Sequence, residues 1–307
     1  MKTLQSVARF LVLCALAIPF LPGSEWGFWA LDGRGSLRFF VYVGALLATP
    51  ALLLHPRGVR LRGLVLVASL ILFGFLQWAW PRSIEALEGV FMLLGADRPV
   101  RGWAGHLVRP VTILAMGAVF GRYFCGWLCP MGALQELLHR PRLRITIPPR
   151  LDRALKFGKY LTAALMVLAP LLFQIRPIGE ADPFTPVFNL RGGALGHGAG
   201  IPPLLLAFVV LLLAASVFVD RPFCRYLSPV GGLLALLARV APARLRLAEH
   251  RCSSCGACAP ACPVGAIRME GAPSRPRISA AECIACRECE GVCPTTCLGF
   301  GAGPPVG

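Results

Sequence analysis

The sequence predicts an α-helical membrane protein of about six transmembrane helices, followed by a small C-terminal α+β domain. The chain has 307 residues, of which 56% are hydrophobic and 15% are charged, whereas soluble domains average about 25% charged residues. Its mean hydropathy is +0.66. Of its 13 cysteines, most lie close together near the C-terminus. This composition argues against a purely soluble protein, a disordered chain and a small disulfide-stabilised scaffold.

Apolar stretches before residue 240 account for the predicted transmembrane domain, residues 1–240. A spanning helix needs about 20 apolar residues, with about 17 as the lower limit. Five stretches approach that length: Leu4–Leu21, Leu37–Leu54, Leu64–Trp80, Tyr160–Ile175 and Ile201–Val219. A sixth, His106–Phe120, is weaker because Arg109 and Pro110 lie near its start. The first stretch also fits a signal peptide, but it lacks a clear cleavage site, so we expect this helix to be retained.

Basic residues predict the orientation of these spans. The segment from residue 121 to residue 160 carries eight basic residues and two acidic ones, and Arg57, Arg60 and Arg62 follow the second span without an acid. The opposite loops are balanced in charge. The positive-inside rule therefore places both termini in the cytoplasm, and we expect a multi-pass protein of the bacterial inner membrane in contact with lipid. The formal net charge of +16 then needs no nucleic-acid partner.

An internal repeat divides the transmembrane domain. Residues 122–134 align without gaps to residues 221–233, and seven of the thirteen positions are identical. Each copy lies just past the cytoplasmic end of a predicted span. Repeats of this kind often build one shared site in a membrane protein, so we expect two related helical hairpins that each end in the same turn.

The strongest signal is a cysteine pattern in the predicted domain of residues 241–300, which precedes a short tail of residues 301–307. Cys252-x2-Cys255-x2-Cys258-x3-Cys262-Pro is followed by Cys283-x2-Cys286-x2-Cys289-x3-Cys293-Pro. This spacing, complete in both runs, is that of bacterial two-cluster ferredoxins, in which the fourth cysteine of each run binds the other cluster. It predicts two [4Fe–4S] clusters, one on a first cysteine set and one on a second: Cys252, Cys255, Cys258 and Cys293, and Cys283, Cys286, Cys289 and Cys262.

Two other interpretations of these cysteines are weaker. Structural zinc sites commonly use two separated cysteine pairs and give no reason for two runs of four with the same long gap and proline. Disulfides are disfavoured in the cytoplasm. Cys297 has no place in either run, and we interpret it as a spare thiol.

The repeat carries a second, weaker group of thiols. Cys125-x3-Cys129 in the first copy corresponds to Cys224-x3-Ser228 in the second. Side chains four residues apart share a face of a helical turn, so these residues could form a further metal site or a redox-active dithiol. The alternative is that both copies are packing turns with inert thiols. Trp127 and Tyr226, which occupy equivalent positions, are candidate cofactor-binding residues.

The segment Gly121–Gln135, its repeat and the double cysteine run together resemble the NapH/MauN-type membrane polyferredoxins, and more distantly NosR and CcoG/FixG. The resemblance covers about residues 105–297. It implies electron transfer between the quinone pool and a redox partner, or a part in the maturation of periplasmic redox enzymes. Ser228 stands where the family usually has a second cysteine, which puts any role that needs four thiols in doubt.

The sequence therefore predicts a membrane-bound iron–sulfur electron-transfer protein, a quinol dehydrogenase-type subunit that works with ferredoxin-type or periplasmic redox subunits and binds quinone. One alternative is an electron donor for the maturation of a periplasmic metallo- or quinone-cofactor enzyme. Another is a transporter with a regulatory ferredoxin domain. The transporter is disfavoured because the predicted spans show no charged residue at mid-depth, where ions or solutes would bind.

Overall fold

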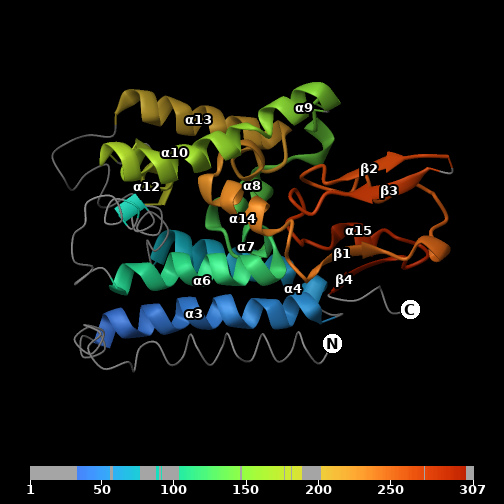
Figure 1. Cartoon of the computed structure of the whole chain (residues 1–307), viewed down its shortest axis with the longest axis horizontal. Coiled ribbons are helices and arrows are strands. Elements are labelled where there is room, and N and C mark those ends of the chain that lie inside the picture. Colours follow the sequence, from blue (N-terminus) through green and yellow to red (C-terminus); the bar gives the residue numbers. More distant parts are fainter. Residues whose placement is uncertain are drawn as a thin grey trace. The chain divides into compact units, whose positions relative to one another are not determined.

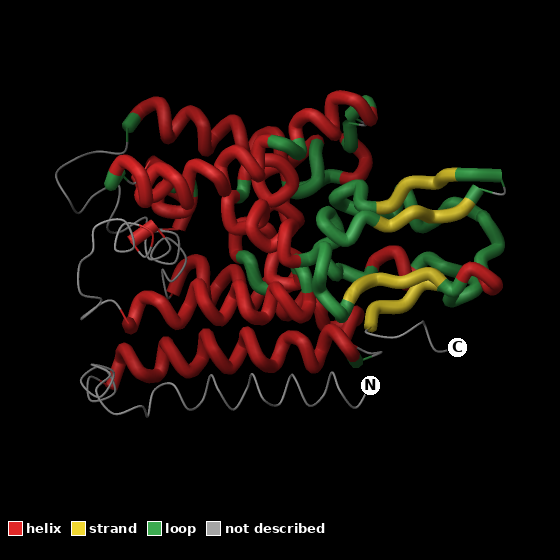
Figure 2. The backbone as a smooth tube through the Cα atoms, in the orientation of Figure 1, coloured by secondary structure: helices red, strands yellow, loops and turns green. Residues whose placement is uncertain are grey.

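The computed structural model describes residues 33–55, 58–76, 88–89, 91, 104–145, 147–175, 177–180, 182–188, 202–272 and 274–301 (Figures 1 and 2). The predicted span Leu4–Leu21 lies outside the described residues. The chain divides into two compact units. The first unit comprises Met1–Arg62, Arg101–Gly126 and Leu234–Gly307; the second comprises Gly63–Val100 and Trp127–Leu233.

Two apolar helices of the first unit, α3 (Gly33–Leu54) and α6 (Ala104–Phe120), pack against each other. They coincide with the second predicted span and with the weak one. The short helix α7 (Tyr123–Trp127) follows α6. The Tyr123 hydroxyl donates a hydrogen bond of 3.3 Å to the Leu46 carbonyl, which ties the start of α7 to α3.

The second unit is built around α8 (Pro130–Leu138), which contacts the π-helical segment η2 (Leu70–Leu76), α13 (Pro203–Phe218) and the π-helical segment η4 (Phe223–Leu227). The remaining helical segments of this unit are short or lead into one another: η3 (Pro141–Leu143), α9 (Pro149–Leu155), α10 (Gly158–Phe173), α11 (Pro177–Glu180) and α12 (Phe184–Phe188). Helix α4 (Gly58–Ser69) leads into η2, and α14 (Pro229–Leu237) leads out of the unit.

Among the residues that the structure describes, two helical stretches are long and apolar enough to cross a membrane, Gly58–Phe75 and Pro149–Phe173. Shorter apolar helices cover Gly44–Leu54, Pro110–Phe120 and Pro203–Phe218. Five of the six predicted spans therefore coincide with described apolar helices, while the number six stays a prediction. On α10 the exposed leucines recur at helical spacing, at positions 161, 165, 168 and 172. A continuous apolar stripe of this kind is typical of a face covered by lipid or by a partner.

The C-terminal domain has the predicted α+β composition. Strand β1 (Arg244–Leu247) pairs antiparallel with β4 (Leu298–Gly301), and β2 (Ile267–Glu270) pairs antiparallel with β3 (Arg275–Ile278) (Figure 1). The 3-10 turn η5 (Glu249–Arg251) precedes the first cysteine run, and α15 (Glu288–Gly291) lies within the second. Strands β1 and β4 are the first and last strands of the domain, and both cysteine runs lie between them in the sequence. Their pairing therefore closes the chain segment that carries the cysteines.

Candidate iron–sulfur sites

The first cysteine set lines one cavity of the C-terminal domain. Its wall contains all four members of the set and Cys297, together with small residues such as Gly256 and Ala257. Met269 and Pro276, which face each other across β2 and β3, close one side. Cys255 is exposed and Cys258 is buried. Cys293 of the second run thus lines the same cavity as three cysteines of the first run; that the four bind one cluster stays a prediction.

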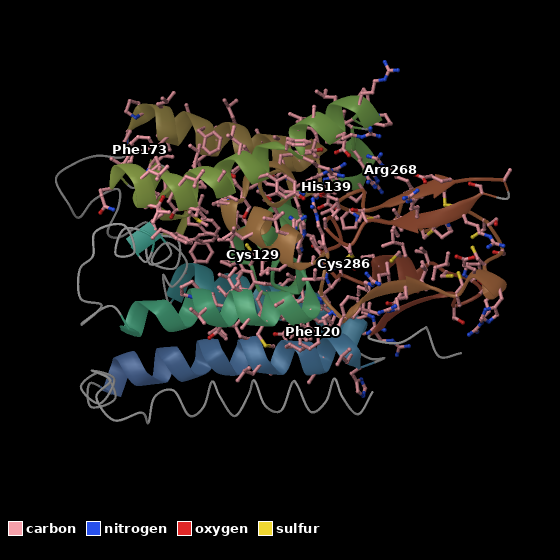
Figure 3. All side chains as sticks on the ribbon, viewed as in Figure 1. Phe120, Cys129, His139, Phe173, Arg268 and Cys286 are labelled. Carbon is pink, nitrogen blue, oxygen red and sulfur yellow. The ribbon has the colours of Figure 1, made fainter. Side chains whose placement is uncertain are left out.

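The second cysteine set lines another cavity, in which Cys262 of the first run joins Cys283, Cys286 and Cys289. The rest of the wall is mainly apolar and includes Leu245, Val264, Ala266, Ile267, Ile284, Ala285 and Phe300. Cys286, labelled in Figure 3, lies on the loop just before α15. Cys262, Cys286 and Cys289 are buried, so this site is better shielded from water than the first.

Matching backbone conformations shape the two cysteine loops. The residues on either side of the second cysteine of each run have positive φ. They are Ser254 (57°) and Gly256 (75°) in the first run, and Ala285 (56°) and Arg287 (64°) in the second. A left-handed conformation at a residue other than glycine costs about 1–2 kcal/mol. Such strain persists only where the surrounding structure holds it, and it clusters at binding sites. The repeated pattern indicates that both loops are shaped for the same kind of ligand.

A further match explains the position of Cys297. Gly265 and Thr296 have positive φ three residues after Cys262 and Cys293 respectively. The next residue is Ala266 in the first run and Cys297 in the second. Cys297 therefore occupies the place of an alanine, and its sulfur lies 3.4 Å from the sulfur of Cys293.

Burial favours the protonated form of three thiols of the second set, Cys283, Cys286 and Cys289. Burial raises the pKa of Cys283 and of Cys286 to about 12, although the Ala285 N–H and the Arg122 charge act against it at Cys283, and the Arg62 charge does so at Cys286. Burial also raises the pKa of Cys289. Iron binds thiolate, so loading of this site must release protons.

The donors at both cavities fit an iron–sulfur cluster, since a [4Fe–4S] cluster is held by four cysteine thiolates. Within the described ranges, no three His, Cys, Asp or Glu side chains are grouped so as to hold a single metal ion. A tetrahedral zinc site requires sulfurs about 3.8 Å apart, because each Zn–S bond is about 2.3 Å long. A cubane takes one cysteine on each of four irons and so spaces its ligands more widely.

Ser228, where the second copy of the repeat lacks a cysteine, caps a helix in the same way as Cys129 does in the first copy. Cys129 is the N-cap of α8, and its sulfur accepts a hydrogen bond of 3.5 Å from the Gly132 N–H. Ser228 holds the same position before α14, and its hydroxyl accepts one of 3.1 Å from the Gly231 N–H. Cys125 belongs to the first unit, whereas Cys129 and Cys224 belong to the second; all three are buried. A shared metal or dithiol site among them stays a prediction.

Trp127 is fully buried, and Tyr226 is nearly so. The Tyr226 hydroxyl donates a hydrogen bond of 2.8 Å to the Asp152 carboxylate, which also pairs with Arg225 at 2.6 Å and Lys156 at 2.9 Å. This buried network was not predicted from the sequence. Asp152 is one of only two acids in the strongly basic segment of residues 121–160, and that contrast was the available signal.

The burial of three arginines was also not predicted: Arg62, Arg122 and Arg221 are fully or nearly fully buried. Arg221 pairs with the other acid of the basic segment, Glu136, through a hydrogen bond of 2.9 Å from its Nε. Arg122 holds the equivalent position in the first repeat copy. It lies instead against the second cysteine run, where its Nη1 is 3.6 Å from the Glu282 carboxylate.

Comparison with known families places iron–sulfur signatures along most of the described chain. A family model described as a 4Fe-4S binding domain matches residues 106–148 and 201–247, so each match contains one copy of the repeat turn. A model described as a 4Fe-4S dicluster domain matches residues 251–297, the whole double cysteine run. These matches support iron–sulfur clusters as the bound groups.

Several curated proteins are similar to this chain. It is 33% identical over 252 residues to the protein NirI of Paracoccus denitrificans, covering 74% of this chain and 34% of NirI. It is 28% identical to the regulatory protein NosR of Stutzerimonas stutzeri, covering 71% and 31% respectively. It is 29% identical to the methylamine utilization ferredoxin-type protein MauN of Paracoccus denitrificans, covering 55% and 61%. The chain thus spans less than two thirds of the length of each of these relatives. No solved structure matches it.

Proposed function

Because the chain belongs to the NapH/MauN/NosR type of membrane polyferredoxins, we propose that it passes electrons between the quinone pool and a redox partner. In this proposal it holds two [4Fe–4S] clusters, one on the first cysteine set and one on the second. The observation that carries the proposal is the pair of cavities, each lined by all four cysteines of one set, one of which comes from the other run. A cluster bound in such a cavity supplies a one-electron redox couple.

The protein's own residues give the two sites different surroundings. Around the second set, Leu245, Ile267 and Phe300 exclude water from the sulfurs. Around the first set, Cys255 is exposed to solvent. A protein partner can therefore approach the loop of Cys252–Cys258 closely, whereas the second set is closed to a partner of that size. We assign the first set to exchange with a soluble domain or subunit.

A third cavity suggests where a quinol ring would approach. It has a volume of about 110 Å³ and lies beside Cys283, between the end of α6 at Phe120 and the strand residues Leu245 and Phe300. Phe120 is labelled in Figure 3. Its described walls combine aromatic and aliphatic side chains with the charged Arg244 and the thiol of Cys283. Apolar walls with a few polar groups are typical of sites for small ligands.

The membrane arrangement in this proposal is six spans, with both termini on the cytoplasmic side of a bacterial inner membrane. It is supported by the apolar stripe on α10 and by the exposed basic residues that precede that helix: Arg140, Arg142, Arg144, Arg150 and Arg153. Basic residues next to a span favour the cytoplasmic leaflet and its anionic lipid headgroups.

The test is reduction of the clusters by a quinol. Purified full-length protein in detergent should contain about eight irons and eight sulfides per chain, as two cubanes require, and a water-soluble quinol analogue should produce their reduced EPR signals. Ala243→Leu, which fills the third cavity, should slow reduction by the quinol analogue and leave reduction by dithionite unchanged. Clusters that dithionite reduces and quinol does not would contradict the quinone role.

The second candidate function, electron donation during maturation of a periplasmic enzyme, is favoured by the similarity to the methylamine utilization ferredoxin-type protein MauN. It requires a path to the thiols at the repeat turns. If this second function is correct, quinol should not reduce the clusters of the wild-type protein. Cys125→Ser should then abolish electron transfer from the clusters to the periplasmic acceptor. Quinol-driven reduction in both the wild type and the variant would favour the respiratory role.

A further inference from the structure

The second cysteine loop packs closely on the first repeat turn, within the first unit. A Cβ atom added to Gly126 would lie 2.1 Å from the carbonyl oxygen of Ile284, which is closer than any side chain allows. Ile284 directly follows Cys283. Only glycine permits this approach, so the residue between Cys125 and Trp127 sets how near the second cysteine set comes to the membrane helices of its unit.

Arg122 fixes the start of the same loop. It is fully buried, and its Nη1 donates hydrogen bonds of 3.2 Å to the Ala281 carbonyl and 3.5 Å to the Glu282 carbonyl. Both carbonyls belong to the two residues that precede Cys283. The charge of Arg122 acts on the Cys283 sulfur, and a buried guanidinium is little screened by solvent.

Arg62 fixes the other end of the loop. Its Nε donates a hydrogen bond of 3.2 Å to the Gly126 carbonyl, and its Nη1 pairs with the Glu288 carboxylate at 2.7 Å. Glu288 lies between Cys286 and Cys289. The charge of Arg62 acts on the Cys286 sulfur. Arg62 is 4% exposed, so it too acts through a medium of low dielectric constant.

The first cysteine set has no equivalent pair among the described residues. Arg275, which directly precedes the wall residue Pro276, forms its ion pair with Glu249 in solvent, where the side chains are 45% and 71% exposed. Exposed charges of this kind are screened and contribute little. The two sites therefore differ in how their charges are solvated. Beside the second set the arginines are buried, and the carboxylate that pairs with Arg62, Glu288, is half-exposed. Near the first set both partners of the ion pair are exposed.

A positive charge near a cluster favours its reduced form, because reduction adds one negative charge to the site. We propose that Arg62 and Arg122 are positioning residues that raise the reduction potential at the second cysteine set above that at the first. This inference rests on the proposed function, in that both sets hold clusters. It predicts that the cluster beside the first repeat turn is the one that is reduced first.

The experiment is an EPR redox titration of the full-length protein in detergent, with the second-set signal identified from its change in Cys286→Ser. Arg62→Gln should lower the reduction potential of the cluster that gives this signal. The expected shift is about 59 mV for one electron, which is a tenfold change in the ratio of reduced to oxidised cluster at a given potential. Glu288→Gln removes the opposite charge from the same ion pair and should raise the reduction potential. Arg62→Lys should retain the wild-type potential, and Arg277→Gln on exposed β3 should change neither signal.

The opposite signs distinguish charge from structure. A merely structural role predicts that both members of the pair shift the signal in the same direction, and that result, or equal shifts of both signals, would overturn the inference. Should Arg62→Gln fail to fold, Glu288→Gln still decides, because the Glu288 side chain is 48% exposed. If the variants show these shifts but quinol does not reduce the clusters of the wild-type protein, only the proposed function is contradicted, and the inference about the arginines stands.

Discussion

Cys129 and Ser228 perform the same structural task in the two copies of the repeat. Each accepts a hydrogen bond from the backbone N–H three residues later, Gly132 and Gly231 respectively, and each precedes a proline that begins a helix. Serine is among the best N-cap residues, and proline is well suited to the first helical position. The place where the repeat loses a cysteine is therefore one where serine serves the fold at least as well.

We expect Cys129→Ser to leave the thermal stability of the detergent-solubilised protein unchanged or slightly raised. Ser228→Ala should lower the free energy of unfolding by about 1 kcal/mol, the usual cost of losing an N-cap. Thermal unfolding of each variant measures both effects. If Cys129→Ser keeps its stability and all clusters but loses electron transfer, the sulfur itself has a redox role and capping is not its only task.

Gly126 provides a test of the packing between the second cysteine loop and the first repeat turn. We expect Gly126→Ala to displace Ile284 and to reduce the iron bound at the second set, because the added Cβ overlaps a backbone oxygen that cannot move independently of Cys283. The iron content and the EPR signal of the second set measure the loss. Gly291→Ala is the matched control, since a Cβ there meets nothing within 4 Å; equal losses in both variants would refute the packing argument.

The ferredoxin-like character of the C-terminal domain could be predicted because its signal is local, in the spacing of the cysteines along the chain. The pairing of Arg62 with Glu288 could not be predicted, because the two residues are 226 positions apart and neither belongs to a motif. Periodicity reports which face of a helix is apolar, and it carries no information on which distant carboxylate a buried arginine meets. The helix cap at Ser228 could have been predicted from the sequence, since Ser-Pro before an apolar run is a signal for the N-terminus of a helix.

The Asp152 network should be a major source of stability in the second unit. Asp152 is 6% exposed, and Asp152→Asn would leave Arg225 and Lys156 without their carboxylate. Removing one partner of a buried ion pair costs about 3–5 kcal/mol, so we expect a large drop in unfolding temperature.

Tyr226→Phe removes only one hydrogen bond to the same carboxylate and should cost about 1.5–3 kcal/mol. The unfolding temperatures of the two variants give the comparison. A Tyr226→Phe protein with wild-type stability and no electron transfer would instead support the cofactor-binding role predicted for this residue.

The crossed arrangement of the cysteines gives the last prediction. Cys262 belongs to the first run by sequence and to the second set by position, since it lines the cavity of Cys283, Cys286 and Cys289. We therefore expect Cys262→Ser to alter the same EPR signal as Cys286→Ser, and Cys293→Ser to alter the other signal. Cys297→Ala is the control, because Ala266 already fills the equivalent place in the first run, and it should retain both clusters. If Cys262→Ser changed the signal that responds to Cys255→Ser, each run would hold its own cluster, and the assignment of both sets would have to be abandoned.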